Sequence, residues 1–253
     1  MKNKTVTIFS YPKSGKMWTS VFLGVYYGML KGMDIDINSD INELSKNDST
    51  VAGIKFTHNL HTNFYGVNAV LLFRDLRDSI VSWYHFCKYR LHTYEGSIDT
   101  FIRDSTEKVH TKYPYYGGID TPIKYYNNIY RNKVNFTNFI FIRYENLGKQ
   151  SIQDNDFAKL LKFIGVEIDA NIFYKALEYC SFDNMQKKEA TGELSRRGFN
   201  KKYVKDGEIN TLHCRKGKSG EYKNILSQES IDFLNRSIEQ KLNPDLKCST
   251  HQR

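Results

Sequence analysis

Residues 10–18 combine the residue types that hold an anion, in the order Ser-Tyr-Pro-Lys-Ser-Gly-Lys-Met-Trp. Before them, residues 5–9 alternate polar and apolar side chains and are rich in β-branched residues, which predicts a strand. After them, apolar residues recur every three or four positions over residues 17–31, which predicts an amphipathic helix. A strand, a tight loop and a helix form a phosphate cradle, because backbone N–H groups and the helix dipole face the anion and a lysine adds a full charge.

This loop differs from the Walker A motif, in which a glycine and four further residues precede Gly-Lys-Ser/Thr. Gly15 and Lys16 are present, but Ser10 occupies the first glycine position and Met17 replaces the hydroxyl that would bind magnesium. A magnesium-dependent nucleotide hydrolase is therefore disfavoured, and we predict no metal site. An ordinary strand, turn and helix without a ligand is the alternative for this segment.

A second candidate anion site surrounds Arg74, which follows the apolar run of residues 68–73. Such a run is typical of a buried parallel strand, and residues 75–90 are predicted to form a helix that carries Ser82. A guanidinium and a hydroxyl eight residues apart could grip the same phosphate. The alternative is an arginine at a strand end and a serine bonded to its own helix backbone.

A third block, Arg215-Lys216-Gly217, places two cations before a glycine, where the backbone can approach an anion closely. The block lies in residues 190–220, a charged stretch without clear periodicity. An irregular segment of this length is either disordered or a functional lid. A solvated basic turn is the alternative for the block itself.

Taken together, the three blocks resemble the motifs of the cytosolic-type sulfotransferases that use 3′-phosphoadenosine 5′-phosphosulfate (PAPS). The first is similar to the family's 5′-phosphosulfate loop, Tyr-Pro-Lys-Ser-Gly-Thr-Thr-Trp, with Lys16 and Met17 replacing the two threonines. The second shares the Arg–Ser spacing and the aromatic-His-Phe ending of the 3′-phosphate motif. The third resembles the C-terminal signature Arg-Lys-Gly-x-x-Gly-acid-aromatic-Lys-Asn. Three blocks in the right order over residues 10–224 are more specific than any one of them.

The resemblance implies PAPS as co-substrate and adenosine 3′,5′-bisphosphate (PAP) as product, with no metal. It places Lys13 at the sulfuryl group and Arg74 and Ser82 on the 3′-phosphate. Trp18 would stack on the base, its alternative being a core tryptophan, and Tyr144 would lie near the adenine. The implied nucleotide-binding residues are Lys13, Ser14, Gly15, Lys16, Met17, Trp18, Arg74, Ser82, Tyr144, Ser181, Phe182, Arg215, Lys216 and Gly217.

The general base is expected among the histidines, because imidazole titrates near neutrality. The family has Lys-Thr-His at the end of its second strand; here the run Lys55-Phe56-Thr57-His58 is one residue longer. We favour His58 as the base, with Lys13 and Lys55 as catalytic lysines, and Lys16 as a further cation. His61 remains the rival base. His85 and His213 are expected to be structural.

Strand-like segments alternate with helix-like ones, which predicts an α/β, P-loop-like three-layer fold with a central parallel sheet flanked by helices. We expect one sulfotransferase domain over residues 1–253. Residues that follow strand ends, including His58, Arg74 and Tyr144, should share one crevice, because ligands of such sheets bind beyond the carboxyl ends of the strands. The predicted strands are 5–9, 51–57, 68–73 and 139–142, and the predicted helices are 17–31, 75–90, 99–109, 119–131, 152–164, 170–179, 181–188 and 229–242.

Composition narrows the range of partners. The 253 residues carry a net charge of +9, which suits an anionic ligand, a nucleic acid or an acidic surface. A nucleic-acid-binding protein is disfavoured, because the lysines are dispersed and the arginines concentrate in the phosphate-site blocks. The four cysteines show no Cys-x-x-Cys spacing and indicate reduced thiols in a cytoplasmic protein. We expect neither a signal peptide nor a membrane span.

The acceptor is not readable from the sequence. A hydroxyl or amine of a small molecule or a glycan is expected, with its pocket formed by residues 32–50, 59–67, 88–118 and 190–212. Residues 32–50 are expected to be a loop with little regular structure, and their spacing of acidic residues does not fit a calcium loop. A P-loop-type small-molecule kinase and a catalytically inactive nucleotide-binding protein of the same fold are the alternative functions. The oligomeric state stays open.

Overall fold

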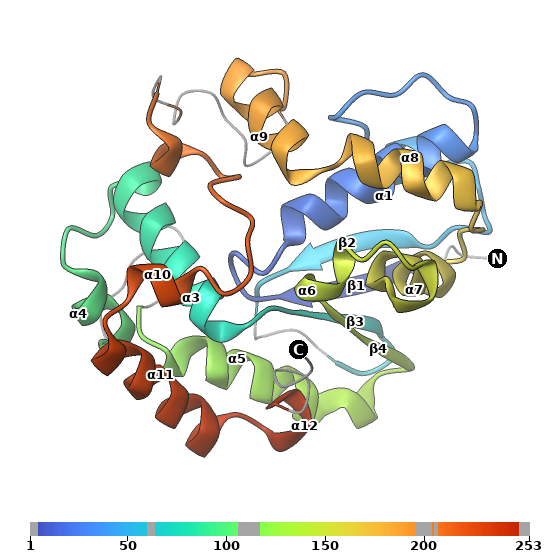
Figure 1. The fold of residues 1–253 in the computed structure, drawn as a ribbon. Coiled ribbons are helices and arrows are strands. Elements are labelled where there is room, and N and C mark those ends of the chain that lie inside the picture. The colour runs from blue at the N-terminus through green and yellow to red at the C-terminus, as the bar shows by residue number, and fades with distance from the viewer. Residues whose placement is uncertain (1–4, 60–63, 106–116, 196–203, 205–206, 248–253) are drawn as a thin grey trace.

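The computed structural model describes residues 5–59, 64–105, 117–195, 204 and 207–247, whose arrangement is shown in Figure 1. Four parallel strands form one sheet in the order β2-β1-β3-β4. Their bounds are Thr5–Ser10 for β1, Gly53–Thr57 for β2, Asn68–Phe73 for β3 and Asn138–Arg143 for β4. Each predicted strand is therefore present, and all four end along the same edge.

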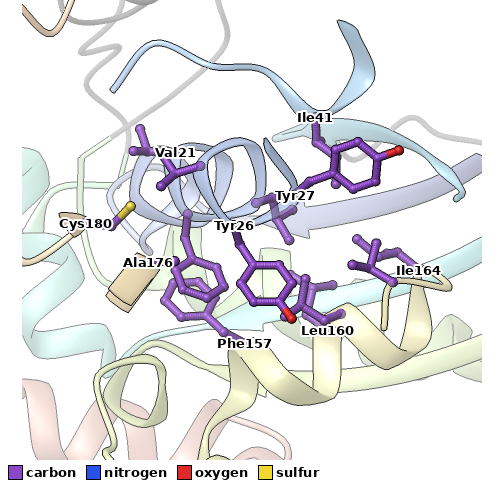
Figure 2. Close-up of a cluster of buried hydrophobic side chains, with 14 of the residues drawn as sticks. Val21, Tyr26, Tyr27, Ile41, Phe157, Leu160, Ile164, Ala176 and Cys180 are labelled. Atoms are coloured by element: carbon purple, nitrogen blue, oxygen red, sulfur yellow. The ribbon is translucent and has the colours of Figure 1, made fainter. Parts of the chain in front are cut away.

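Three helices cover one face of the sheet: α1 (Lys16–Leu30), α7 (Asp156–Phe163) and α8 (Ala170–Tyr179). Alternation along β1 turns Val6 and Ile8 toward this layer. The layer is rich in rings, and Phe22 stacks on Phe157 with 3.9 Å between centroids. Figure 2 shows this cluster, in which Tyr26 and Tyr27 of α1 also lie. This packing fixes α1, and with it the loop that precedes α1.

The opposite face is covered by α3 (Leu76–His85), α4 (Ile98–Arg103), α5 (Asp120–Arg131) and α11 (Gln228–Lys241). Phe9 of β1 and Leu71 of β3 point toward this second layer. The residues that precede them, Ile8 and Val70, point toward the first layer. Helices on both faces give the three-layer architecture predicted from the strand–helix alternation. In this layer α3 begins soon after β3 ends, so Arg74 lies at the junction and Ser82 lies on the helix.

Residues 32–50 are more ordered than predicted, because they contain the short helix α2 (Ile41–Leu44). The side chain of Asp40 accepts a hydrogen bond from the backbone N–H of Asn42 and caps this helix. Ile37 and Ile41 are buried against the α1 layer. Two buried apolar anchors and one cap are enough to order a segment that shows no helical periodicity.

Several helix bounds differ from the predicted ones. The helix predicted at 75–90 is α3 followed by a π-helical segment, Phe86–Leu91, and the one at 152–164 is a 3₁₀ turn, Ile152–Asp154, followed by α7. The helix predicted over 181–188 is α9 (Phe182–Thr191). Short elements that were not predicted are α6 (Tyr144–Leu147), α10 (Tyr222–Ile225), α12 (Pro244–Lys247), and 3₁₀ turns at Asn132–Asn135 and Ile209–Thr211. Parts of the predicted helix 99–109 and of the segment 190–220 lie outside the described residues.

Among the described residues, no helix is long and apolar enough to cross a membrane. The same residues contain no group of three or more His, Cys, Asp or Glu side chains that could hold a metal ion. Cys87, Cys180 and Cys214 form no disulfide within the part of the chain that the structure describes, and Cys248 lies outside it.

Candidate active site

A cavity of about 1360 Å³ opens at the carboxyl ends of the strands. It is lined by residues that follow each strand, as the predicted crevice requires. Of the predicted site residues, those that line it are Lys13, Gly15, Lys16, Met17, Trp18, His58, Arg74, Ser82, Tyr144, Phe182, Arg215, Lys216 and Gly217. The three blocks, far apart in the sequence, therefore share one space.

The loop between β1 and α1 is tightly folded. Lys13 has φ 69° and Gly15 has φ 101°, and the backbone N–H of Ser14 donates to the carbonyl of Tyr11. A Cβ on Gly15 would lie 2.5 Å from the Tyr144 ring, so only glycine fits without displacing that ring. The first turn of α1 lines the cavity with Lys16, Met17 and Trp18, and the N–H groups of a helix's first turn have no partner within the helix, so they can bind an anion there.

Lys13 projects into the space between α3 and the C-terminal block. Its Nζ lies 3.1 Å from Nδ1 of His213 and 4.6 Å from the centroid of the Phe86 ring. Burial lowers the pKa of Lys13 from 10.5 to about 7, and the nearby positive charges of Arg90 and Arg74 contribute to this shift. An anionic ligand would restore the charge by raising that pKa, so Lys13 is suited to binding an anion.

Arg74 is buried at the end of β3. Its guanidinium donates a 3.1 Å hydrogen bond to the Lys13 carbonyl and lies 4.2 Å from the centroid of the Tyr144 ring. Its Nε is buried and has no hydrogen-bond partner among the described residues. A buried unpaired donor on a permanent cation fits a phosphate group in this place.

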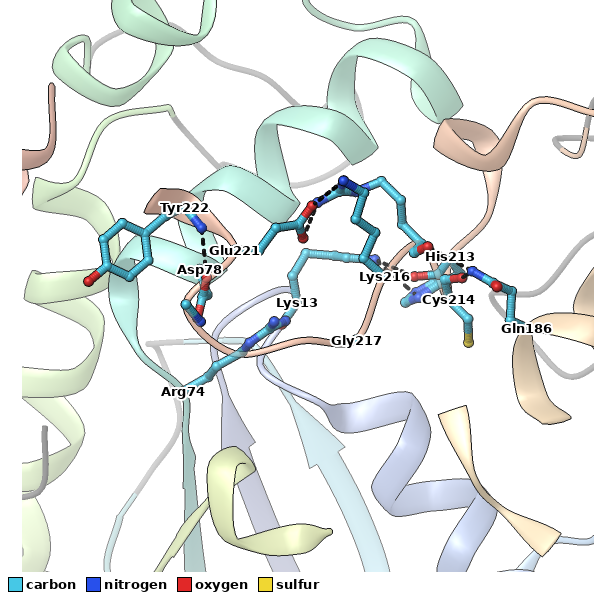
Figure 3. Close-up of polar contacts among 12 residues, drawn as sticks. Lys13, Arg74, Asp78, Gln186, His213, Cys214, Lys216, Gly217, Glu221 and Tyr222 are labelled. Atoms are coloured by element: carbon cyan, nitrogen blue, oxygen red, sulfur yellow. Dashed lines mark hydrogen bonds and ion pairs between the residues drawn. The ribbon is translucent and has the colours of Figure 1, made fainter. Parts of the chain in front are cut away.

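The C-terminal block approaches the loop from the other side, as Figure 3 shows. Arg215 forms a bidentate pair with Glu221, at 2.8 and 2.7 Å, and Lys216 lies 3.2 Å from the same carboxylate. The hydroxyl of Tyr144 donates to the carbonyl of Gly217 at 3.3 Å. Two cations are thus held beside the cavity by one acidic residue.

Gly217 has φ 62°, and a Cβ there would lie 2.0 Å from the ring of Phe182. The block therefore requires glycine at this position for both its backbone conformation and its packing. Phe182 begins α9 and lines the cavity beside Met185.

His58 lies just past β2, with Nδ1 2.5 Å from the Ser10 carbonyl. A carbonyl only accepts hydrogen bonds, so Nδ1 carries the proton and Nε2 has the lone pair. Burial, with the charge of Lys16 as the second cause, lowers the pKa of His58 to about 4. The ring is therefore neutral at pH 7, as a proton acceptor must be.

Trp18 packs against the core, which was the alternative to stacking on the base, and it also lines the cavity, so stacking on the base stays a prediction. Its Nε1 donates to the Cys180 carbonyl at 2.8 Å, and its ring makes edge contacts with Tyr144 and Phe157. These contacts fix the plane of the indole at the cavity wall.

Three predicted site residues do not line the cavity. Ser14 is buried, and its hydroxyl lies 2.7 Å from the hydroxyl of Tyr126 beneath the loop. Lys55 is exposed on β2, and Ser181 precedes α9 without lining the cavity. The rival base, His61, lies outside the described residues.

Sequence reasoning missed a polar network that holds the C-terminal block. The carboxylate of Asp78 accepts from the backbone N–H groups of Gly220 and Tyr222, at 2.7 and 3.2 Å. Gln186 donates to the carbonyls of Cys214 and Arg215. His213, which was expected to be structural, lines the cavity. No local sequence motif predicts these contacts, because the two partners of each hydrogen bond lie 28 to 144 residues apart in the sequence.

Comparisons with known proteins agree with this geometry. Residues 3–244 match the model of the family described as "Sulfotransferase domain". Flavonol 3-sulfotransferase from Flaveria bidentis is 23% identical over 266 residues, which cover 94% of this chain and 81% of the relative.

Two solved structures share the fold, which confirms the predicted P-loop-like α/β architecture. Mouse sulfotransferase SULT7A1, solved with PAP, has a TM-score of 0.62 at 17% identity, covering 99% of this chain and 90% of that one. Retinol dehydratase, solved with androsterone and the inactive cofactor PAP, has a TM-score of 0.61 at 16% identity, covering 98% and 82%. Since the family model spans nearly the whole chain, the protein belongs to the sulfotransferase domain family and is a sulfotransferase enzyme.

Proposed function

We propose that this sulfotransferase moves the sulfuryl group of PAPS to a hydroxyl or amine of a small molecule or glycan, with His58 as the general base. The observation that carries the proposal is the meeting of Lys13, Arg74 and His58 in one cavity at the carboxyl edge of the sheet. This chemistry needs one cation for each of the two anionic groups of the nucleotide, the 5′-phosphosulfate and the 3′-phosphate. It also needs a neutral imidazole to accept a proton.

The donor assignment rests on two groups of cations. Lys13, which lines the cavity, would bind the 5′-phosphosulfate together with the N–H groups at the start of α1. Arg74, Ser82 and the Arg215 block would hold the 3′-phosphate, and the unpaired Nε of Arg74 supports this. Two solved structures of the same fold contain PAP.

The bound donor would supply an activated sulfuryl group, and the protein would supply position and charge. His58 Nε2 takes the proton of the acceptor while the acceptor oxygen or nitrogen forms its bond to sulfur. The bond from sulfur to the bridging phosphate oxygen breaks, and that oxygen leaves with the electron pair. Lys13 stabilises the negative charge that develops there, with Lys16 as a second cation on the His58 side.

The acceptor side of the cavity mixes rings with polar groups. Tyr11 and Tyr125 form an edge-to-face pair at 5.9 Å, and Trp83 and Phe86 stack at 5.7 Å. These rings suit a flat organic acceptor, and a relative named for flavonols supports a small molecule over a glycan. Lys55 has no part in this mechanism, because its side chain is exposed and does not line the cavity.

Calorimetric titration without magnesium tests the donor assignment. We expect wild type to bind PAP at least tenfold more tightly than ADP, and Arg74→Ala to lose that preference. Arg131→Ala removes the same charge from an exposed position at the end of α5 and should bind PAP as wild type does. Equal affinity for ADP and PAP would overturn the proposal and favour a kinase-like site.

The base assignment has its own experiment. His58→Asn should lower kcat with a phenolic acceptor by at least a hundredfold, the usual contribution of a general base. Its Kd for PAP should stay within twofold of wild type. A His58→Asn enzyme with normal turnover would exclude His58, and normal PAP binding without turnover in wild type would favour an inactive nucleotide-binding protein.

A further inference from the structure

The ammonium of Lys13 is held by two acceptors of one residue. Its Nζ lies 3.1 Å from the ring Nδ1 of His213 and 3.4 Å from the carbonyl of His213. An ammonium is a donor only, so Nδ1 accepts and the ring proton sits on Nε2. Burial and the neighbouring cations lower the pKa of His213 well below 6.5, which keeps the ring neutral and able to accept.

A buried ion pair fixes the backbone of His213. The carboxylate of Glu189 accepts from the backbone N–H groups of His213 and Cys214, at 2.7 and 2.8 Å. The same carboxylate pairs with Arg90 at 2.9 Å, and Arg90 also donates to the carbonyl of Thr211 at 2.6 Å. Both side chains of the pair are almost fully buried, at 1% and 0% exposure, so this anchor is shielded from solvent.

The ring of His213 is fixed as well. It meets the Phe86 ring edge-on at 5.4 Å between centroids, and the same Phe86 ring lies 4.6 Å from Nζ of Lys13. Phe86, His213 and Lys13 therefore form one packed group, which Figure 3 shows in part, with His213 and Lys13 facing each other. Phe86 ends the second nucleotide-binding block, whereas Glu189 belongs to none of the three blocks.

We propose that His213 is a positioning residue for Lys13. It takes two of the three ammonium N–H groups and leaves the third for an anion in the cavity. Without this support the four-carbon side chain of lysine has many rotamers, and the cost of ordering them in the transition state would oppose catalysis. The consequence for turnover rests on the proposed function above, whereas the contact itself does not.

Burial lowers the pKa of Lys13, and charged neighbours act on it in both directions. Arg74 and Arg90 oppose its protonation, from the end of β3 and from the π-helical segment, and Glu189 of α9 favours it. His213 adds an acceptor without a charge. Replacing that acceptor by a hydrocarbon ring should lower the pKa of Lys13 further and increase the fraction of reactive neutral amine.

The experiment is competitive acylation of nucleotide-free full-length protein with trace acetic anhydride from pH 6 to 10, with Lys13 labelling quantified by peptide mass spectrometry. His213→Phe keeps the ring and removes the acceptor, and should label at least threefold faster at pH 7. His213→Asn offers an amide oxygen near the place of Nδ1 and should stay within twofold of wild type. His85→Phe is the matched control, because His85 is a half-buried histidine whose two buried ring nitrogens make no hydrogen bond among the described residues.

Wild-type labelling in His213→Phe would overturn the proposal, and so would fast labelling in His213→Asn. Should His213→Phe fail to fold, as circular dichroism would show, His213→Ala decides the same question. In turnover assays, His213→Phe should lower kcat at least tenfold and change KM for PAPS less than threefold, with His213→Asn largely restored. Absence of turnover in wild type would reject the proposed function alone, because the labelling result does not depend on PAPS.

Discussion

Oδ2 of Asp78 accepts a 2.7 Å hydrogen bond from the backbone N–H of Gly220, which joins α3 to the C-terminal block. Oδ1 of the same carboxylate accepts from the N–H of Tyr222. Asp78 lies between Arg74 and Ser82 in sequence, so both parts of the proposed 3′-phosphate site meet through one buried side chain. Removal of this side chain should therefore weaken folding and nucleotide binding together.

For Asp78→Asn we expect the free energy of unfolding to fall by about 2 kcal/mol, because one buried N–H loses its acceptor. The Kd for PAP should rise at least fivefold as the Arg215 block loosens. Denaturant unfolding and calorimetry measure the two effects. Asp183→Asn, at an exposed position of α9, is the control and should leave both unchanged. A destabilised variant with unaltered PAP affinity would show that the block closes without Asp78.

Gly217→Ala and Gly32→Ala separate backbone strain from packing. The two glycines have φ 62° and 61°, but a Cβ would meet Phe182 at Gly217 and nothing within 4 Å at Gly32. Both changes should cost about 1 kcal/mol in stability for the left-handed conformation. Only Gly217→Ala should also weaken PAP binding, by about tenfold, because Phe182 must move. Equal PAP affinities in the two variants would rule out the contact with Phe182 as a constraint on the site.

The sheet and most of the cavity lining could be predicted, because both depend on local patterns. Apolar runs specify the strands, and parallel order brings the residues after each strand to one edge. Arg74 and Ser82 reach the cavity as expected, since the strand–helix junction between them leaves little freedom. The position of the motif blocks at the cavity could therefore be predicted from their place after the strands.

The direction of individual side chains could not be predicted so well. Lys55 alternates with the buried Ile54 along β2, so its side chain is exposed although the strand leads to His58. Ser14 turns inward because Tyr126, from a distant helix, offers it a partner. The contact of His213 with Lys13 joins residues 200 positions apart. Contacts of this kind depend on tertiary packing, which a single sequence does not display.

His85 offers a test of pH-dependent stability. Burial, with the charge of Arg215 as the second cause, lowers its pKa from 6.5 to about 4. Between pH 6.5 and 4 the unfolded chain binds a proton at this residue that the folded chain does not, so the folded state loses stability as the pH falls. His85→Phe should reduce that loss by up to about 1.4 kcal/mol per pH unit.

Unfolding by urea at pH 7, 6 and 5 measures the slope in both proteins. At pH 7 the variant should be as stable as wild type or more so, because two buried ring nitrogens that lack partners among the described residues are removed. An unchanged slope would mean that the ring is protonated equally in the folded and unfolded chain. A large loss of stability at pH 7 would mean instead that the imidazole has a polar partner in the folded protein.

The Arg90–Glu189 pair makes the last prediction, because it lies beneath the proposed Lys13–His213 contact. In Glu189→Gln, Arg90 stays buried without a counter-charge, and one of the two backbone donors faces an amide nitrogen. We expect a loss of about 3 kcal/mol in the free energy of unfolding, together with faster acylation of Lys13. Glu193→Gln removes the same charge from the exposed Lys188–Glu193 pair and should change neither. If Glu189→Gln were destabilised while Lys13 kept its wild-type reactivity, the ion pair would support the fold but not the position of His213.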